Sequence, residues 1–369
     1  MNVTIIQPPL VQLNTPYPSG AYLKAFFEDV KTSAENETET CVDARGNLIG
    51  NVRWLDLSNG LFHKIFSSSG LKKLFLLSEK TALEMAEKSD ENTAFQIRRY
   101  ISLSDAWCFW IDRIVEIACG GKSAREYTHE FVRSPHVPRG NRMENFLYNL
   151  GRDVTSDDAK ILASLALADL ADYITAVFDP DFRLISYAEH LGTSEASFSN
   201  VIEGLKSPVL TEFYDALLEE ELEIPKQVRN DTNAEPFDKA HGSFRNDTKV
   251  EHFDRAQGPV RKDTIGELFL VSVPFPGCFE AAVYTAQKIR KMYDKNAIIA
   301  LGGGFCNTEL RNISETRLFD YFDLISYDMG YGSYLHLLDK IKAGNAFDGN
   351  PIYKIKYLYD GKIIGDCDT

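Results

Sequence analysis

The sequence has few of the motifs that mark a reactive centre. Its six cysteines are scattered, and no two of them form a CxxC or CxxxC pair. A zinc ribbon or a local iron–sulfur motif is therefore not encoded, and we expect reduced, buried thiols. The chain also lacks HExxH, a Walker loop and an ordered Ser-His-Asp set. We therefore assign it no catalytic and no metal-binding residue.

Long apolar runs and an excess of positive charge are also absent. No segment approaches the roughly 18 to 20 apolar residues of a membrane span, and the N-terminus has no basic, apolar leader. The 54 acidic residues outnumber the 40 basic ones and give a net charge of -14, which argues against a surface for nucleic acid. We expect a cytoplasmic protein without nucleic-acid or membrane partners.

The chain does contain alternating strands and helices near both of its ends. Residues 3–7 form a β-branched strand pattern that stops at Pro8-Pro9, and residues 20–30 have helical spacing. Continuous apolar strands are predicted at 268–273, 297–301 and 322–326, with helices at 278–293, 309–319 and 334–342. Weaker strands are indicated at 41–43 and 51–56, and a hairpin at 352–359 and 362–364.

These elements predict an α/β fold with a doubly wound, mostly parallel sheet of the flavodoxin-like or Rossmann-like kind. The expected strand order resembles 2-1-3-4-5. Ligands of such sheets bind at the carboxyl ends of the strands, near the switch point between the first and third strands. The candidate site therefore consists of the loops at 8–20, 274–277, 302–308 and 327–332.

A long helical region separates the two halves of this pattern. Helices are predicted at 72–86, at 94–118 with a break near Ser102, and at 156–178. The last of them begins at Thr155 or Ser156 and stops at Asp179-Pro180. We interpret the aromatic cluster of Trp107, Phe109 and Trp110 as core.

A tandem repeat with a period of 16 residues occupies positions 229–264, where Arg229, Arg245 and Arg261 align. Each copy offers little apolar surface to offset the entropy of ordering, so we expect a disordered insertion. The predicted organisation has five parts: a first α/β part at 1–60, a helical insertion at 61–223, the repeat insert at 224–266, a second α/β part at 267–345, and a hairpin and linker at 346–369.

Three segments resemble the cobalamin-binding domain of radical S-adenosylmethionine enzymes. QPPL and PYPSGAYL, within residues 7–23, are similar to the first strand, proline loop and helix of that family. SVPFPGCFEAAVYTAQKIRK and AIIALGGG, within residues 272–304, resemble its strand-helix-strand that ends in glycines. FDYFDLISYDMGYGSYLHLLDKI, residues 319–341, resembles its next strand, loop and helix. The helical region is not covered.

The resemblance implies a cobalamin site in the loops that follow the strands. Glycines let backbone approach a large flat ligand, and small residues leave a slot for its nucleotide tail. The cofactor-binding residues that the resemblance implies are Pro8, Pro9, Pro16, Tyr17, Pro18, Ser272, Pro274, Gly302, Gly303, Gly304, Phe305, Thr308, Tyr327, Asp328, Met329, Gly330 and Tyr331.

The chain departs from the family in two of these loops. Classical cobalamin modules carry DxHxxG after the first strand, whereas residues 8–20 contain no histidine. We therefore expect cobalamin without a protein histidine on cobalt. In residues 327–332, tyrosine and aspartate stand where the family has glycine and glutamate, and Asp328 is the candidate to replace one carboxylate.

The radical motif CxxxCxxC is also missing from the chain. In the family its three thiolates hold a [4Fe-4S] cluster and leave one iron for S-adenosylmethionine. We expect both groups only in a full-length form with a downstream radical domain, so this chain alone is not expected to be catalytic. The implied function is to position cobalamin and an unknown small-molecule or peptide substrate.

Two other functions stay open. The first is a non-catalytic Rossmann-like module for binding or sensing, and the second is a degenerate fragment that has lost its ligand. A flavodoxin-like nucleotide enzyme is disfavoured, because the prolines of the first loop remove amide donors that a phosphate would need.

Overall fold

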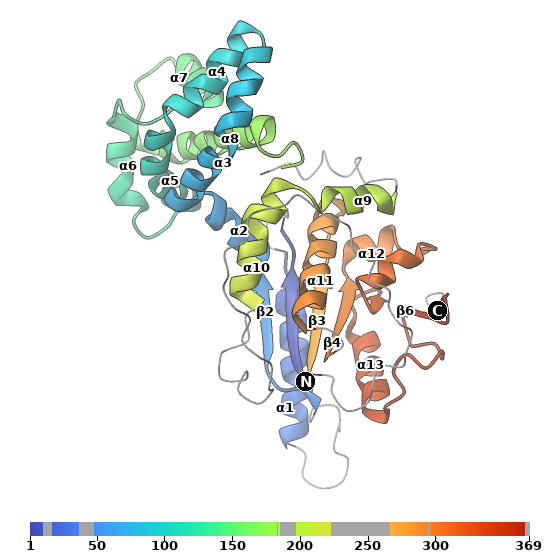
Figure 1. The fold of residues 1–369 in the computed structure, drawn as a ribbon. Coiled ribbons are helices and arrows are strands. Elements are labelled where there is room, and N and C mark those ends of the chain that lie inside the picture. Colours follow the sequence, from blue (N-terminus) through green and yellow to red (C-terminus); the bar gives the residue numbers. More distant parts are fainter. Residues whose placement is uncertain are drawn as a thin grey trace, which may run out of the picture.

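The computed structural model describes residues 1–9, 17–36, 48–182, 184, 197–222, 266–293 and 296–365. Its centre is a seven-stranded sheet with the order β2-β1-β3-β4-β5-β6-β7 (Figure 1). The strands are β1 (Asn2–Gln7), β2 (Val52–Asp56), β3 (Glu267–Ser272), β4 (Ala297–Gly302), β5 (Leu324–Ser326), β6 (Ile355–Tyr359) and β7 (Lys362–Gly365). The first five are parallel and the last two antiparallel. The predicted doubly wound sheet, its 2-1-3-4-5 order and its final hairpin are confirmed.

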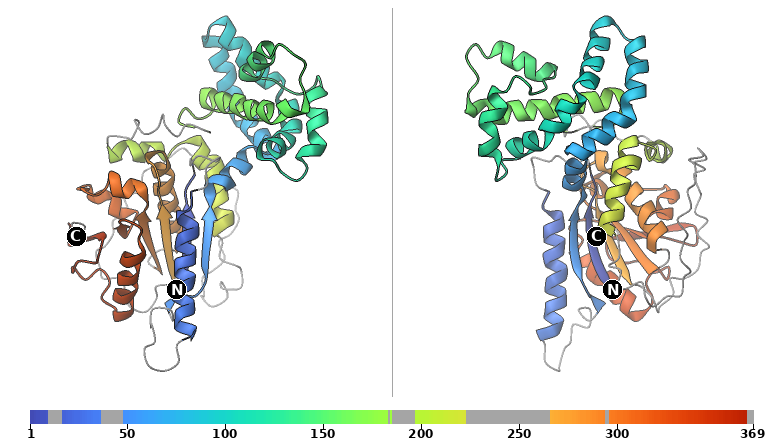
Figure 2. Two further views of the ribbon diagram at one scale, coloured as in Figure 1. Left: turned by 180° about the vertical axis from the view of Figure 1, so that it is seen from behind. Right: turned by 60° about the vertical axis from the view of Figure 1, so that its left-hand side comes forward.

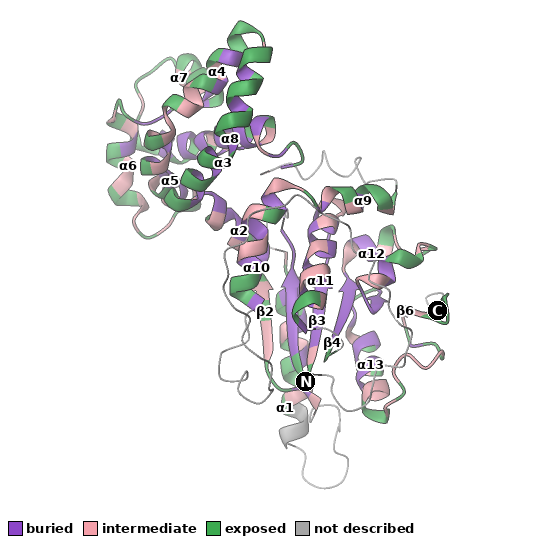
Figure 3. Ribbon diagram, viewed as in Figure 1, coloured by how far each residue is buried: buried purple, intermediate pink, exposed green. Residues whose placement is uncertain are grey.

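Helices cover both faces of the sheet because its strands are apolar on both sides. On one face, α1 (Ser19–Asn36) and α13 (Tyr331–Ala343) pack against a cluster that includes Ile5, Leu270 and Leu324. On the other face, α10 (Asp215–Leu222) and α11 (Phe279–Tyr293) belong to a cluster that includes Val271 and Leu301. Figure 2 shows α1 on the face opposite α10 and α11, and Figure 3 shows the strands between them as mostly buried.

A bundle of helices extends beyond the carboxyl edge of the sheet (Figure 1). It is entered through α2 (Leu57–Ile65), and α9 (Phe198–Gly204) lies back near the sheet. Its members are α3 (Ser68–Lys88), α4 (Glu91–Ser102), α5 (Ser104–Cys119), α6 (Ala124–Arg133), α7 (Asn141–Asn149) and α8 (Ala159–Val177). The predicted helices of this region are confirmed, as is the break near Ser102.

The start of α8 was predictable from its polar residues. Thr155 and Asp158 form a capping box on the 3-10 turn Ser156–Asp158, which leads directly into α8, and Asp158 accepts the Thr155 backbone N–H at 2.9 Å. The interpretation of the aromatic cluster as core is confirmed for Trp107 and Trp110, which are buried. It is wrong for Phe109, whose ring is 56% exposed beneath the Arg113 guanidinium.

The prediction of a helix at residues 309–319 is wrong. Helix α12 spans only Gly304–Thr308, and a 3-10 helix at Thr316–Asp320 follows a loop. Arg311 lies in this loop, where its guanidinium donates to the Asn307 carbonyl and to the Asp328 carboxylate. Glu315 then caps the new turn by accepting the Arg317 backbone N–H at 3.0 Å.

The prediction that the cysteines are reduced and buried is confirmed in part. Cys108, Cys119, Cys278 and Cys306 are all free, and Cys278 and Cys306 are buried, but Cys119 is exposed at the end of α5. The predicted strand at 41–43, the repeat at 229–264 and Pro16 lie outside the described residues. Among the described helices, none is long and apolar enough to cross a membrane.

Candidate functional site

A cleft opens at the carboxyl ends of β3, β4 and β5, between the first turns of α1 and α13. Its volume is about 530 Å³, which suits a small ligand or part of a larger one. Its lining residues are Tyr17, Pro18, Ser19, Tyr22, Leu23, Leu270, Val271, Ser272, Gly302, Gly303, Gly304, Asn307, Ser326, Asp328, Met329, Gly330, Tyr331 and Tyr334.

Most of the cofactor-binding residues that the resemblance implies line the cleft. Ten of them line it: Tyr17, Pro18, Ser272, Gly302, Gly303, Gly304, Asp328, Met329, Gly330 and Tyr331. Pro8, Pro9, Pro274, Phe305, Thr308 and Tyr327 are not among the lining residues. Phe305 is turned into the core against Phe279, with ring centroids 4.9 Å apart, and Tyr327 is buried with its hydroxyl on the Leu310 carbonyl.

The sequence interpretation missed several lining residues, above all Ser19, Asn307, Ser326 and Tyr334. Ser326 ends β5 as Ser272 ends β3, so the shared position at a strand end could have indicated it. Tyr334 offered no such signal, because it lies inside α13 and only the packing of that helix brings it to the cleft.

The glycines after β4 have two different reasons to lack a side chain. Gly303 has a φ of +104°, and a Cβ there would lie 2.4 Å from the Val273 carbonyl oxygen. Gly302 has no such conflict, because its Cβ would lie 3.4 Å from the Tyr334 hydroxyl oxygen. The backbone conformation at position 303 therefore requires glycine, whereas the missing side chain of Gly302 leaves space in the cleft.

Tyr17 and Ser19 close one side of the cleft. The Tyr17 hydroxyl lies near the Gly304 backbone and the Ser19 side chain. The Ser19 and Ser272 hydroxyl oxygens are 2.9 Å apart. Burial is the main cause that raises the pKa of Tyr17, so its hydroxyl is protonated and neutral at physiological pH.

A second group of hydroxyls lies on the opposite side. The Ser333 hydroxyl donates to the Gly330 carbonyl at 2.9 Å, and the Ser326 and Ser333 hydroxyl oxygens are 2.8 Å apart. The Tyr334 hydroxyl lies near Ser326, and burial is the main cause that raises the pKa of Tyr334. The polar groups of the inner cleft are therefore neutral hydroxyls.

Asp328 lines the cleft, but two cations already hold its carboxylate. Arg311 donates to it at 2.6 Å, and Lys354 donates to its second oxygen. Its backbone N–H donates to the Asn307 side chain at 2.7 Å. The hydrogen bond from Lys354 is the largest of the causes that hold the pKa of Asp328 below its ordinary value. The carboxylate thus stabilises the turn after β5, in which Asp328 itself has a φ of +58°.

Aromatic and apolar side chains frame the opening. Phe26 and Tyr331 stack with centroids 4.9 Å apart and join α1 to α13. Tyr22 and Met329 are largely exposed at the rim. The cleft therefore combines an apolar rim with neutral hydroxyls inside it, an arrangement suited to a flat heterocycle.

Among the residues that the structure describes, no histidine lines the cleft, and no cluster of three or more His, Cys, Asp or Glu side chains could hold a metal ion. Comparison of the chain with models of protein families, with curated proteins and with solved structures finds no match.

Proposed function

We propose that the cleft binds the nucleotide tail of cobalamin, and that the α/β part positions this cofactor and a substrate for radical chemistry. The observation that carries the proposal is the cleft lined by glycine and serine at the carboxyl edge of β3 to β5, in a sheet of order 2-1-3-4-5. Sheets of this order bind ligands at that edge.

The residues present fit such a tail. Ser272, Gly302 and Ser326 end the three strands without bulky side chains, so a ring can lie against the strand ends. A Cβ on Gly302 would project toward Tyr334 and fill part of this space. The first turns of α1 and α13 contain no acidic residue and suit the phosphate of the tail.

In this proposal the chain's own residues bind and orient the cofactor. Ser272 and Tyr334 offer hydrogen bonds, and the Phe26–Tyr331 pair joins the two helices beside the opening. The described lining residues include no histidine that could bind cobalt. Bound cobalamin would supply a methyl group or an electron. A [4Fe-4S] cluster and S-adenosylmethionine would come with a segment that carries CxxxCxxC, which this sequence does not contain.

The test is a binding spectrum. The purified chain is mixed with hydroxocobalamin or methylcobalamin, free ligand is removed, and the visible spectrum is recorded. We expect retained cobalamin with a base-off spectrum, because a tail held in the cleft is removed from cobalt and none of the described lining residues is a histidine that could replace it. A protein that retains no cobalamin at any accessible concentration would refute the proposal.

Two alanine substitutions make the test specific to the cleft. Gly302→Ala adds a methyl group to the cleft wall and should weaken cobalamin binding about tenfold, as expected for an overfilled site. Gly266→Ala is the matched control at the opposite end of β3, where the nearest atom to a new Cβ is 4.0 Å away. Equal affinities of the two variants would place the ligand outside this cleft.

A further inference from the structure

The floor of the cleft belongs to a row of residues at the strand ends. Ser272, Gly302 and Ser326 are the last residues of β3, β4 and β5. Each lies two positions after a member of the apolar cluster beneath α1 and α13, as Ser272 follows Leu270. Side chains two positions apart in a strand point to the same face, so these three positions form one row on that face of the sheet.

Gln7 continues this row on the next strand. It ends β1, two positions after Ile5 of the same cluster. Because Ile6 pairs with Val271 in the parallel register, Gln7 is level with Ser272 on the neighbouring strand. Adjacent strands are about 4.8 Å apart. The Gln7 side chain therefore leaves the sheet beside Ser272, which lines the cleft.

The Gln7 side chain carries an acceptor that the chain itself does not use. Gln7 is 3% exposed, and its Oε1 is buried without a hydrogen-bond partner among the described residues. Its neighbour Ser272 already meets Ser19, with hydroxyl oxygens 2.9 Å apart. A buried acceptor without a partner lowers stability, so a ligand that donates to Oε1 supplies a hydrogen bond that the unliganded chain lacks.

The start of α1 adds hydrogen-bond donors at the same end of the cleft. Ser19 is the first residue of α1, and the Tyr22 N–H donates to the Pro18 carbonyl at 3.1 Å. The helical N–H groups before Tyr22 have no acceptor within the helix, and the first turn contains no acidic residue. Amide donors therefore lie close to the Gln7 acceptor. A hydroxyl group, which both accepts and donates, fits this combination.

We propose that Gln7 binds the ribose of the nucleotide tail by accepting a hydrogen bond from a ribose hydroxyl. The tail consists of a phosphate diester, a ribose and 5,6-dimethylbenzimidazole. The diester is ionised at neutral pH and the N-linked base has no N–H, so only the ribose can donate a hydrogen bond. This inference rests on the proposed function and assigns one further binding residue to it.

The experiment measures the affinity of the full chain for two corrinoids by equilibrium dialysis. The ligands are cobalamin and cobinamide, which lacks the phosphate, the ribose and the base. Gln7→Met keeps the length of the side chain and removes its carbonyl oxygen. We expect this variant to bind cobalamin about tenfold more weakly, the effect of one hydrogen bond in a buried site. The weaker binding of cobinamide should not change.

Gln96→Met is the matched control. Gln96 lies in α4 of the helical bundle and is not among the lining residues of the cleft, and its Oε1 is likewise buried without a partner among the described residues. Both substitutions remove an unsatisfied buried oxygen, so both should raise the urea midpoint of the unliganded chain. Only Gln7→Met should change the affinity for cobalamin.

The outcomes separate the ribose contact from the proposed function. Unchanged cobalamin affinity in Gln7→Met, or an equal loss for cobinamide, overturns the inference and leaves the proposed function intact. A lower urea midpoint of Gln7→Met also overturns it, because Oε1 would then have a partner in the unliganded chain. Wild-type protein that binds neither corrinoid, or binds both equally, refutes the binding of the tail in the cleft and the ribose contact with it.

Discussion

Adjacent glycines after β4 differ in what they contribute, and substitution at each gives a different result. Gly303→Ala forces a Cβ toward the Val273 carbonyl at a φ of +104°, which should lower the free energy of unfolding by about 1–3 kcal/mol. Gly302→Ala should cause no loss of stability, because its new contact is ordinary. Urea denaturation of both variants measures the difference, and equal losses would contradict it.

Asp328 combines a left-handed backbone with two cationic partners, so its charge should stabilise the turn after β5. Asp328→Asn retains a side chain that tolerates the positive φ, but it removes the charge and one of the two oxygens that accept hydrogen bonds from Arg311 and Lys354. At neutral pH we expect a loss of about 0.5–1 kcal/mol in the free energy of unfolding, typical of a partly exposed ion pair.

The pH dependence of this loss follows from the lowered pKa of Asp328. The ordinary pKa of the carboxyl is 3.8, and its pKa in the folded chain lies below that value. Its contribution is therefore complete above pH 3.8 and disappears as the pH falls through the lower folded value. Denaturation curves of wild type and Asp328→Asn should converge in acid, and a constant difference between pH 7 and pH 2 would contradict this account.

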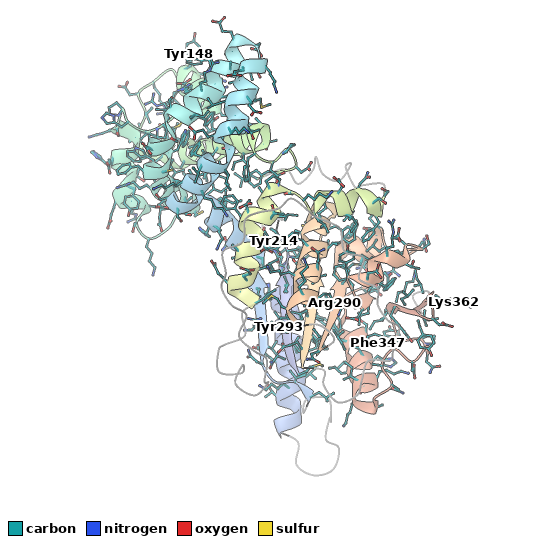
Figure 4. All side chains as sticks on the ribbon, viewed as in Figure 1. Tyr148, Tyr214, Arg290, Tyr293, Phe347 and Lys362 are labelled. Carbon is teal, nitrogen blue, oxygen red and sulfur yellow. The ribbon has the colours of Figure 1, made fainter. Side chains whose placement is uncertain are left out.

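At the scale of elements, side-chain hydrogen bonds connect α11 to the sheet and to α10. Arg290 of α11 donates to the Asp323 carboxylate, which also accepts the Ile299 backbone N–H of β4 at 2.8 Å. Tyr293 of the same helix donates to the Leu222 carbonyl of α10 at 2.8 Å. Figure 4 labels Arg290 and Tyr293 in this layer, with Tyr214 nearby.

Removal of the Arg290 guanidinium should therefore destabilise the packing of α11 on the sheet. Asp323 is 5% exposed, and loss of the cation beside a buried carboxylate costs about 3–5 kcal/mol. We expect Arg290→Met to lower the free energy of unfolding by this amount in urea titration. Lys206→Met, at an exposed pair with Glu203, is the control and should change stability by less than about 1 kcal/mol.

At the scale of the whole molecule, one apolar cluster continues from the helical bundle into the sheet. It includes Trp107 of α5, Phe66 after α2, Phe182 after α8 and Val271 of β3. Phe66 and Phe182 approach with ring centroids 6.4 Å apart, at the junction of the two parts. A shared core predicts that the bundle and the sheet unfold together.

Two optical probes can test this cooperativity. In a Trp54→Phe variant the remaining tryptophans, Trp107 and Trp110, lie in the bundle, so fluorescence reports the bundle and far-ultraviolet circular dichroism reports the whole chain. We expect coincident urea transitions. Phe66→Ala should lower the midpoints of both, at a cost of about 3–5 kcal/mol. Separate transitions in the Trp54→Phe protein would show that the bundle folds independently.

Much of the architecture could be predicted from the amino-acid sequence. Local periodicity and capping were sufficient to predict the apolar runs of β3 and β4 and the capped turn at 155–158 that precedes α8. The region at 309–319 could not be predicted in this way. Helix α12 stops at Thr308, and the loop that follows makes contacts with distant residues, as Arg311 does with Asp328, 17 positions away in the chain.

The composition of the cleft was decided by the tertiary structure. Ser19 and Ser272 are 253 positions apart and meet because β1 and β3 are neighbours in the sheet. The Asp328 carboxylate likewise meets Arg311 and Lys354, which lie 17 and 26 positions away in the chain, only in the folded turn after β5. The amino-acid sequence by itself determined the elements and the edge at which they end, because periodicity and capping are local. The partners of each polar group were decided only where distant strand ends converge, because a hydrogen bond requires two groups within about 3 Å of each other.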